Sequence, residues 1–384
     1  MPFPWLRRSG SAETGRGGRR RGARAQRRGP QRRGDRNDAN PQVDPRAVAE
    51  RRHRRTGFGI GAAFLFVIVG VVAFGYYQEF YKPPRIWAGS VNNVEFKMGD
   101  LVQRIRVLQG VNRYQGGQVN LSTVPFEYLQ NLINAEVLRQ KSQSLGINVT
   151  DEAIERELRR QFVPTADPGQ ETDPGQLERE FKDNYGSFLT ATRLSDSEFR
   201  VIVEEQIAIT SLAVLLAQDI EDPQQQVEIQ WIRLPLESDI LANDVAKRLE
   251  NEDFTRVAQE LNTPGQFAGT DGYVGWVPKG AFPNFDDAIF GDAEEGIQPL
   301  EPGTISEPIF DNDVFVLLKV LSGAEERELD DRMSLKLTVE LVEMWQRDAL
   351  TAGSEAKTVR MNFNSRLYEW VTDQVFITAP RVDR

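Results

Sequence analysis

An uncharged run of 21 residues, from Gly57 to Tyr77, limits what this chain can fold into more than any other feature. Phe, Val, Ile, Leu, Ala and Gly dominate it, and as a single helix it is long enough to cross a hydrocarbon core of about 30 Å. Pro83 and Pro84 follow shortly afterwards, and proline ends a helix because it lacks the amide donor that an interior turn needs. The sequence therefore predicts one transmembrane anchor over residues 57–78.

The two sides of this run carry opposite charge. Residues 1–56 hold 17 Arg and no Lys against 5 acidic residues, a net charge of +12. Because the whole chain carries −10, the remainder sums to −22. Arginine crowds the N-terminal flank, and aromatic residues follow the run (Tyr76, Tyr77, Phe80 and Tyr81). The positive-inside rule then places the N-terminus in the cytoplasm and the C-terminal part outside.

A cleaved signal peptide is the competing interpretation of the apolar run. Its core is longer than that of a signal peptide, more than 50 residues precede it, and no small-residue cleavage site follows promptly. We therefore expect the anchor to be retained. The expected location is a bacterial plasma membrane, crossed once, with the C-terminal domains extracytoplasmic.

Residues 1–56 have the composition of a disordered cytoplasmic segment. Their Arg-Gly and Arg-Arg repeats, with Gln, Asn, Gly and Pro, supply too little apolar surface to form a core. Two roles stay open: a topogenic signal that lies on anionic lipid, or a segment that contacts RNA or the ribosome through arginine. We favour the first role, because no RNA-binding fold accompanies the charge.

Helical spacing of apolar residues characterises the first half of the exported part. The pattern predicts helices over about 99–111 and 126–145. Thr150 is suited to cap a third helix, and Ser195 with Glu198 forms a capping box for a fourth. We therefore expect a helical domain over residues 86–222.

The pattern changes at Pro223. Residues 227–231 alternate between apolar and polar, as a half-buried strand does, and residues 314–320 are nearly all apolar, as in a central strand. Between them, the spacing predicts one helix over about 242–261. These features predict a compact α+β domain over residues 226–322.

Two further helices are expected after this domain. The first is long and amphipathic, and the residues expected on its apolar face are Leu335, Val339, Val342, Trp345 and Ala349. The second covers about 363–374. We expect residues 325–380 to pack on the first helical domain, so the predicted fold class is α+β. A helical domain made of N- and C-terminal helices would contain an inserted small α+β domain and follow one transmembrane helix.

The order of several segments resembles a known family. Residues 126–158 are similar to the core helix pair of the SurA/PrsA-type foldases, whose chaperone domain is related to that of trigger factor. Residues 227–320 resemble a parvulin-type (PpiC-like) peptidyl-prolyl isomerase, or rotamase, domain. The matching segments are VEIQWIRL, GTDGYVGWVPKGAFPNFDDAIF, PGTISEPIF and VFVLLKV. Together the matches cover about 86–350.

The chain departs from the parvulin pattern at its histidines. Parvulins carry two histidines that hydrogen-bond each other and shape the proline site, and these positions fall at Trp231 and Phe315 here. The single histidine is His53, on the N-terminal side of the apolar run. Strong isomerase activity is therefore not expected, no catalytic residue is assigned, and whether the chain is an enzyme stays open.

The resemblance also implies an apolar peptide-binding surface. Phe282 and Phe285 stand where parvulins hold the proline ring, and Trp276, Trp231 and Phe315 would enlarge that surface. Proline isomerisation requires rotation about one bond, over a barrier of about 18–20 kcal/mol, and no proton transfer. An apolar site could therefore act without the histidines. For Trp231 and Phe315, filling the core is the favoured alternative.

Several other chemistries are excluded by composition. The chain has no cysteine, and its histidine lies before the apolar run, so zinc, Ser-His-Asp and Cys-His sites are excluded in the exported part. The glycines of residues 265–280 do not follow a strand in a phosphate-loop pattern. We therefore expect no metal, no cofactor and no small-molecule substrate.

The resemblance implies a membrane-anchored extracytoplasmic chaperone that binds unfolded or nascent secreted and envelope proteins. Its parvulin-like domain would bind peptide with weak or absent isomerase activity. An active peptidyl-prolyl cis-trans isomerase is the first alternative. The second is a membrane scaffold whose basic N-terminal segment binds RNA or the ribosome.

Overall fold

The computed structural model describes most of the chain after residue 44. The described residues are 45–117, 124–163, 173–236, 240–262, 265, 267–311, 313–362 and 364–378. The chain divides into two units, Met1–Gly70 and Val71–Arg384. Disorder was predicted for residues 1–56; residues 1–44 lie outside the described part, and the prediction is wrong for residues 45–56, which are helical. Helix α1 (Pro45–Tyr76) begins earlier than predicted, because Ala, Arg and Glu between Ala47 and Arg55 are good helix formers that extend the apolar helix backwards.

One helix of the described part is long and apolar enough to cross a membrane. This stretch, Gly61–Arg85, has no buried residue in its most apolar window. It includes the end of α1, a π-helical turn over Tyr77–Tyr81 and a 3-10 turn over Pro83–Arg85. Length and composition therefore agree with the predicted anchor, and a signal sequence would meet the same two criteria.

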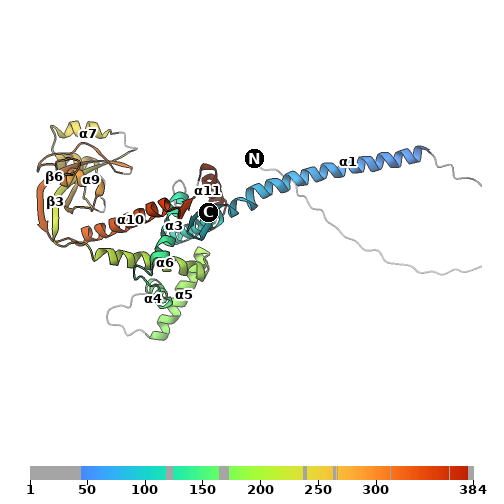
Figure 1. Cartoon of the computed structure of the whole chain (residues 1–384), viewed down its shortest axis with the longest axis horizontal. Helices are drawn as coiled ribbons and strands as arrows, with labels where there is room; N and C mark the ends of the chain where they lie inside the picture. Colours follow the sequence, from blue (N-terminus) through green and yellow to red (C-terminus); the bar gives the residue numbers. More distant parts are fainter. Residues whose placement is uncertain are drawn as a thin grey trace, which may run out of the picture. The chain divides into compact units, whose positions relative to one another are not determined.

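The first half of the second unit is helical, as predicted (Figure 1). The Thr150 hydroxyl accepts a hydrogen bond from the Ala153 amide, and Ser195 and Glu198 form the expected capping box. The elements are β1 (Trp87–Val91), β2 (Val94–Lys97), α2 (Met98–Tyr114), α3 (Val124–Lys141), α4 (Asp151–Phe162), α5 (Pro174–Thr192) and α6 (Asp196–Ala217).

Helix α5 was not predicted, although its start carries a clear signal. Asp173 accepts a hydrogen bond from the Gly175 amide and Pro174 occupies the first turn, where proline is favoured. The helix contributes Phe181, Tyr185 and Phe188 to an aromatic core shared with α4 and α6. This core makes the three helices one packed group.

The last segments of the chain complete the helical domain. Strand β7 (Val359–Met361) pairs antiparallel with β1, giving a small sheet in the order β2-β1-β7. Helix α11 (Ser365–Thr378) places Leu367, Trp370 and Val371 in the same apolar core as residues of α2 and α3. Residues 275 positions apart, Trp87 and Asn362, therefore lie in contact.

A four-stranded antiparallel sheet in the order β4-β3-β6-β5 forms the centre of the α+β domain. Trp231 on β3 pairs with Leu318 on β6. Alternate residues of β3 enter two cores, one with Ile229 and Trp231, the other with Ile232 and Leu234. The strands and helices are β3 (Gln224–Pro235), α7 (Ala242–Leu249), α8 (Phe254–Leu261), β4 (Tyr273–Pro278), α9 (Pro283–Phe290), β5 (Ile309–Asp311) and β6 (Val314–Arg327).

The single helix predicted over 242–261 is wrong, because two helices occupy this range. Asp253 lies between them, and its carboxylate accepts a hydrogen bond from the Arg256 amide at 3.0 Å. Asp and Asn side chains compete for backbone amides and favour helix starts over helix interiors. The apolar spacing continues across the break and conceals it.

Helix α10 (Asp331–Glu355) also differs from the prediction. Leu335 and Val339 are exposed, although both were expected on its apolar face. The early turns of α10 bury Met333 and Leu337 in the core of the α+β domain, and its last turns bury Ala349 in the core of the helical domain. Because the helix contacts two different cores, its buried face shifts along its length.

We predict that Gly272 is required for the close contact between β4 and β3. Its φ is +77°, and a Cβ there would lie 2.2 Å from the Trp231 carbonyl oxygen. Gly272→Ala should lower the free energy of unfolding by about 2–5 kcal/mol, from left-handed backbone strain plus the clash. Urea denaturation of the variant and of the unaltered chain measures this difference in the free energy of unfolding.

Gly303→Ala is the matched control. Gly303 also has a positive φ, +89°, but nothing lies within 4 Å of its added Cβ. The Gly303→Ala variant should lose only about 1–2 kcal/mol of its free energy of unfolding, which is the contribution of the left-handed backbone. Equal losses in the two variants would contradict the close approach at Gly272.

Candidate functional site

Three of the five residues predicted to bind proline lie together. Trp231 comes from β3, Phe282 precedes α9 and Phe285 lies in its first turn. The ring centroids of Trp231 and Phe282 are 5.2 Å apart, edge to face, and those of Phe282 and Phe285 are 6.1 Å apart. Such edge-to-face pairs are a favourable aromatic geometry. We call Trp231, Phe282 and Phe285 the aromatic cluster.

The start of α10 covers the aromatic cluster. Met333 and Leu337 pack into the same core, and the Lys336 ammonium lies 5.1 Å from the centre of the Phe282 ring. The exposed fractions are only 4% for Trp231, 8% for Phe282 and 2% for Phe285. A bound peptide therefore has little access to these rings while α10 is in this position.

The other two predicted residues lie elsewhere. Trp276 on β4 stacks under the Arg327 guanidinium at 4.3 Å, outside the apolar core that contains the cluster. Phe315 pairs with Leu234 and packs against the core on the opposite face of the sheet from Trp231. The expectation that Phe315 would enlarge the same surface is therefore wrong, because a strand alternates its side chains between faces.

Asp286 is the ionisable group closest in sequence to the cluster. Its carboxylate accepts a hydrogen bond from the Gly280 amide, at 2.9 Å and 3.2 Å to the two oxygens. Burial is the largest influence and raises the pKa of Asp286 to about 6, and repulsion from Asp287 and from Glu340 of α10 adds to it. The Gly280 bond and Lys279 oppose this rise.

A second candidate site is a cleft of about 200 Å³ beside α3 and α6 in the helical domain. Apolar side chains line it together with three carboxylates, Glu136, Glu204 and Glu205, and the Arg139 guanidinium. Val201 on α6 is 42% exposed at this cleft. The apolar lining residues are Phe96, Leu132, Ala135, Ile147, Val149, Val201 and Ala208. We call this hollow the α3–α6 cleft.

The carboxylates of the α3–α6 cleft differ in their surroundings. Burial opposes ionisation of Glu136, but hydrogen bonds from Arg139 and Gln140 together outweigh it and lower the pKa of Glu136. Burial raises the pKa of Glu205 despite its ion pair with Arg104. Within the described part of the chain, Glu204 makes no ion pair or hydrogen bond. Arg139 also lines the cleft, and its hydrogen bonds to Glu136 and the nearby charge of Glu204 raise its pKa. The cleft therefore offers the Glu204 carboxylate, close to one arginine, beside apolar surface.

Sequence reasoning missed the α3–α6 cleft, although one signal was present. Glu136 interrupts the apolar face of the helix predicted over 126–145, between Ile133 and Val137. A carboxylate on a buried face is uncommon unless it is paired.

In the described ranges, no three His, Cys, Asp or Glu side chains gather closely enough to hold a metal ion.

Comparison with known proteins identifies the helical part. The family of SurA-like N-terminal domains matches residues 50–213, which include the residues of the α3–α6 cleft from Phe96 to Ala208. Among curated proteins, no sequence matches the chain.

Three similar solved structures have low scores. Peptidylprolyl isomerase (PrsA) from Bacillus anthracis is 17% identical, with 61% of this chain and 99% of that chain covered and a TM-score of 0.37. Foldase protein PrsA from Streptococcus pneumoniae is 11% identical, with 76% and 93% covered and a TM-score of 0.30. One structure of the SurA-like chaperones PEB4 and Cj1289 of Campylobacter jejuni is 14% identical, with 57% and 97% covered and a TM-score of 0.22.

The family match, rather than these scores, decides the assignment. Residues 50–213 match the family of SurA-like N-terminal domains, and the predicted resemblance to the SurA/PrsA-type foldases is confirmed.

Proposed function

We propose that the chain is a membrane-anchored extracytoplasmic chaperone that holds unfolded segments of secreted or envelope proteins. The observation that carries this proposal is the α3–α6 cleft, an apolar hollow lined by carboxylates within the SurA-like domain. An unfolded segment with an apolar side chain beside a basic one fits this lining. The apolar side chains of the lining would bury the first, and Glu204 would attract the second.

The anchor proposal rests on the apolar stretch and its flanks. Gly61–Arg85 satisfies the length and composition of a membrane span. Exposed aromatic residues mark the end of the apolar run (Tyr76 and Tyr77) and the residues just after it (Phe80 and Tyr81), which is the position of an aromatic interface belt. The arginines before the run and the net charge of −22 after residue 56 favour a cytoplasmic N-terminus.

Adaptable contacts fit a holding function. Helices α6 and α10 carry exposed apolar side chains in addition to those of the cleft. Single exposed apolar residues are common, but several on neighbouring helices provide weak contacts that many sequences can use. These residues are Ile209, Val214, Leu335, Val339 and Met344.

We also propose that the α+β domain is a parvulin-like module with weak or absent isomerase activity. The aromatic cluster supports an apolar site, but α10 covers it and the usual histidine positions hold Trp231 and Phe315. A client would reach Phe282 only after the first turns of α10 moved away. An active isomerase remains the alternative, and the contact of the Trp231, Phe282 and Phe285 rings with one another supports it.

The first prediction concerns Val201 in the α3–α6 cleft. Val201→Asn should weaken protection of a chemically denatured client about three- to tenfold, because burying valine contributes about 1.5–3 kcal/mol at most. The measurement is the concentration of full chain, in nanodiscs, that halves client aggregation.

Val214→Asn is the matched control for this measurement. Val214 lies on the same helix and is 60% exposed, but it does not line the α3–α6 cleft. As one of several weak, dispersed contacts, Val214 should contribute less to protection than Val201 does, with a loss below about twofold. An equal loss in both variants would contradict a specific role of the cleft.

The second prediction separates core packing from catalysis at Phe285. Phe285→Ala should lower the free energy of unfolding by about 3–5 kcal/mol, as expected for a buried phenylalanine. Exchange NMR of a proline peptide should detect no acceleration by the unaltered chain. Acceleration that Phe282→Ala removes at unchanged melting temperature would establish the isomerase alternative instead.

The third prediction is a pH dependence caused by Asp286. Because its folded-state pKa is raised to about 6, the folded protein holds this proton more tightly than the unfolded chain does. The resulting stabilisation is fully present below the unfolded pKa of about 3.9 and is lost as pH rises through about 6. Urea titrations between these values should therefore show stability falling in the unaltered chain relative to Asp286→Asn. Parallel pH curves would contradict the raised pKa.

A further inference from the structure

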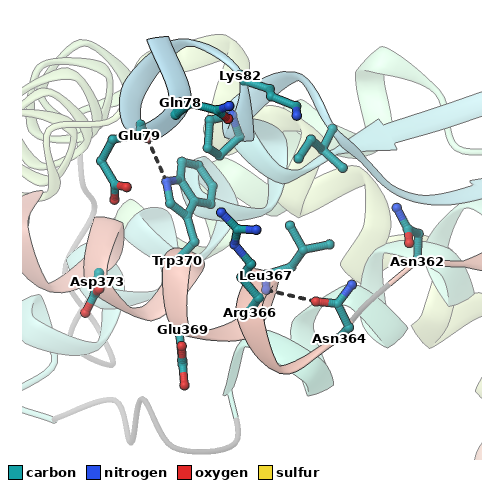
Figure 2. Close-up of a pocket in the computed structure, with 12 residues that line it drawn as sticks. Gln78, Glu79, Lys82, Asn362, Asn364, Arg366, Leu367, Glu369, Trp370 and Asp373 are labelled. Atoms are coloured by element: carbon teal, nitrogen blue, oxygen red, sulfur yellow. Dashed lines mark hydrogen bonds between the residues drawn. The ribbon is translucent and has the colours of Figure 1, made fainter. Parts of the chain in front are cut away.

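A hollow of about 620 Å³ adjoins the end of the candidate membrane span (Figure 2). The turn that follows α1 supplies Glu79 and Lys82, and α11 supplies Arg366, Glu369 and Asp373. The Trp370 indole N–H of α11 donates a hydrogen bond to the Glu79 carbonyl oxygen at 3.1 Å, which fixes the two walls to each other. Its volume is within the range of about 300–1,000 Å³ that is typical of small-molecule pockets.

The charged side chains of this hollow have no partners. Glu79, Lys82, Arg366, Glu369 and Asp373 are all exposed. Within the residues that the structure describes, none of the five side chains makes an ion pair or a hydrogen bond. Several other surface charges of the chain form ion pairs, as in the two made by Arg159 and those made by Arg200 and Arg248. The hollow therefore gathers charges of both signs that remain available to a ligand.

The two signs are separated across the hollow. Figure 2 shows Lys82 with the side-chain amides of Asn362 and Asn364 toward one side. The carboxylates of Glu79, Glu369 and Asp373 lie toward the other side, and the Arg366 guanidinium lies between the two groups. A ligand that carries an anion and a cation a few atoms apart would match this arrangement.

We propose that this hollow binds the zwitterionic headgroup of a phosphoethanolamine-type lipid. Lys82 and Arg366 would hold the phosphate, because charge-assisted hydrogen bonds to phosphate are strong and arginine matches its geometry. Glu369 and Asp373 would accept hydrogen bonds from the ammonium group. The inference rests on the proposed membrane anchoring, which would bring the exposed rings of Tyr76 and Tyr77 to the level of the headgroups.

The chemistry of the lining distinguishes this ligand from other lipid headgroups. A choline headgroup carries no N–H donor, so it would leave the three carboxylates without hydrogen bonds. A headgroup with only negative charge would be repelled by the same carboxylates. Binding of the ethanolamine headgroup would hold the start of the helical domain against the membrane surface through α11.

The test uses the full chain in nanodiscs that contain phosphatidylcholine, phosphatidylethanolamine and phosphatidylglycerol in equal parts. After transfer to mild detergent, native mass spectrometry identifies the lipids that remain bound. We expect retained phosphatidylethanolamine. Arg366→Ala and Glu369→Ala should each lower its retention roughly tenfold, as expected for a charge-assisted hydrogen bond of about 1.5 kcal/mol. Arg347→Ala, which alters an exposed arginine of α10 outside the hollow, should change nothing.

The outcomes separate this site from the proposed function. A chain that stays in the nanodiscs but retains no phosphatidylethanolamine, or prefers phosphatidylglycerol, overturns the site alone. An equal loss of retained phosphatidylethanolamine in Arg347→Ala and Arg366→Ala also overturns the site. The site is overturned as well if inorganic phosphate displaces the lipid as readily as free phosphoethanolamine does. A chain that leaves the nanodiscs overturns the anchoring and the site with it. Client protection is measured separately and depends on neither result.

Discussion

The burial of one helix in two cores is the interaction on which the arrangement of the chain after the apolar stretch depends. Helix α10 places Met333 and Leu337 among the aromatic residues of the α+β domain and Ala349 in the core of the helical domain. The helix is continuous between these points. One helix therefore joins the core beside the aromatic cluster to the core of the helical domain.

Much of the architecture follows from local patterns in the sequence. Fold class, the capping residues Thr150 and Ser195, and the strand around Trp231 are all confirmed. Each depends on residues near one another in the chain, where helix caps and period-two alternation carry the information. The family resemblance of the helical part is of the same kind, because it rests on continuous segments.

The features that were missed depend on distant contacts or on short interruptions. Strand β7 has only three residues and is defined by its pairing with β1, more than 260 positions away. The face on which Phe315 lies depends on its register with Leu234, and Leu335 is exposed because α10 changes partners. The α3–α6 cleft needs two helices and their relative orientation, which no single segment specifies. Local periodicity contains none of this information.

The pairing of β7 with β1 also sets an order for the folding of the protein. Ala88 and Val91 belong to β1, the first strand after the apolar stretch, whereas Leu367 and Val371 belong to α11, and the two segments share one core. Such non-local contacts form late, because the intervening chain must first be brought together. During synthesis, the helical domain would stay incomplete until the last segments had arrived. The core of the helical domain is therefore incomplete for most of the time during which the protein is synthesised.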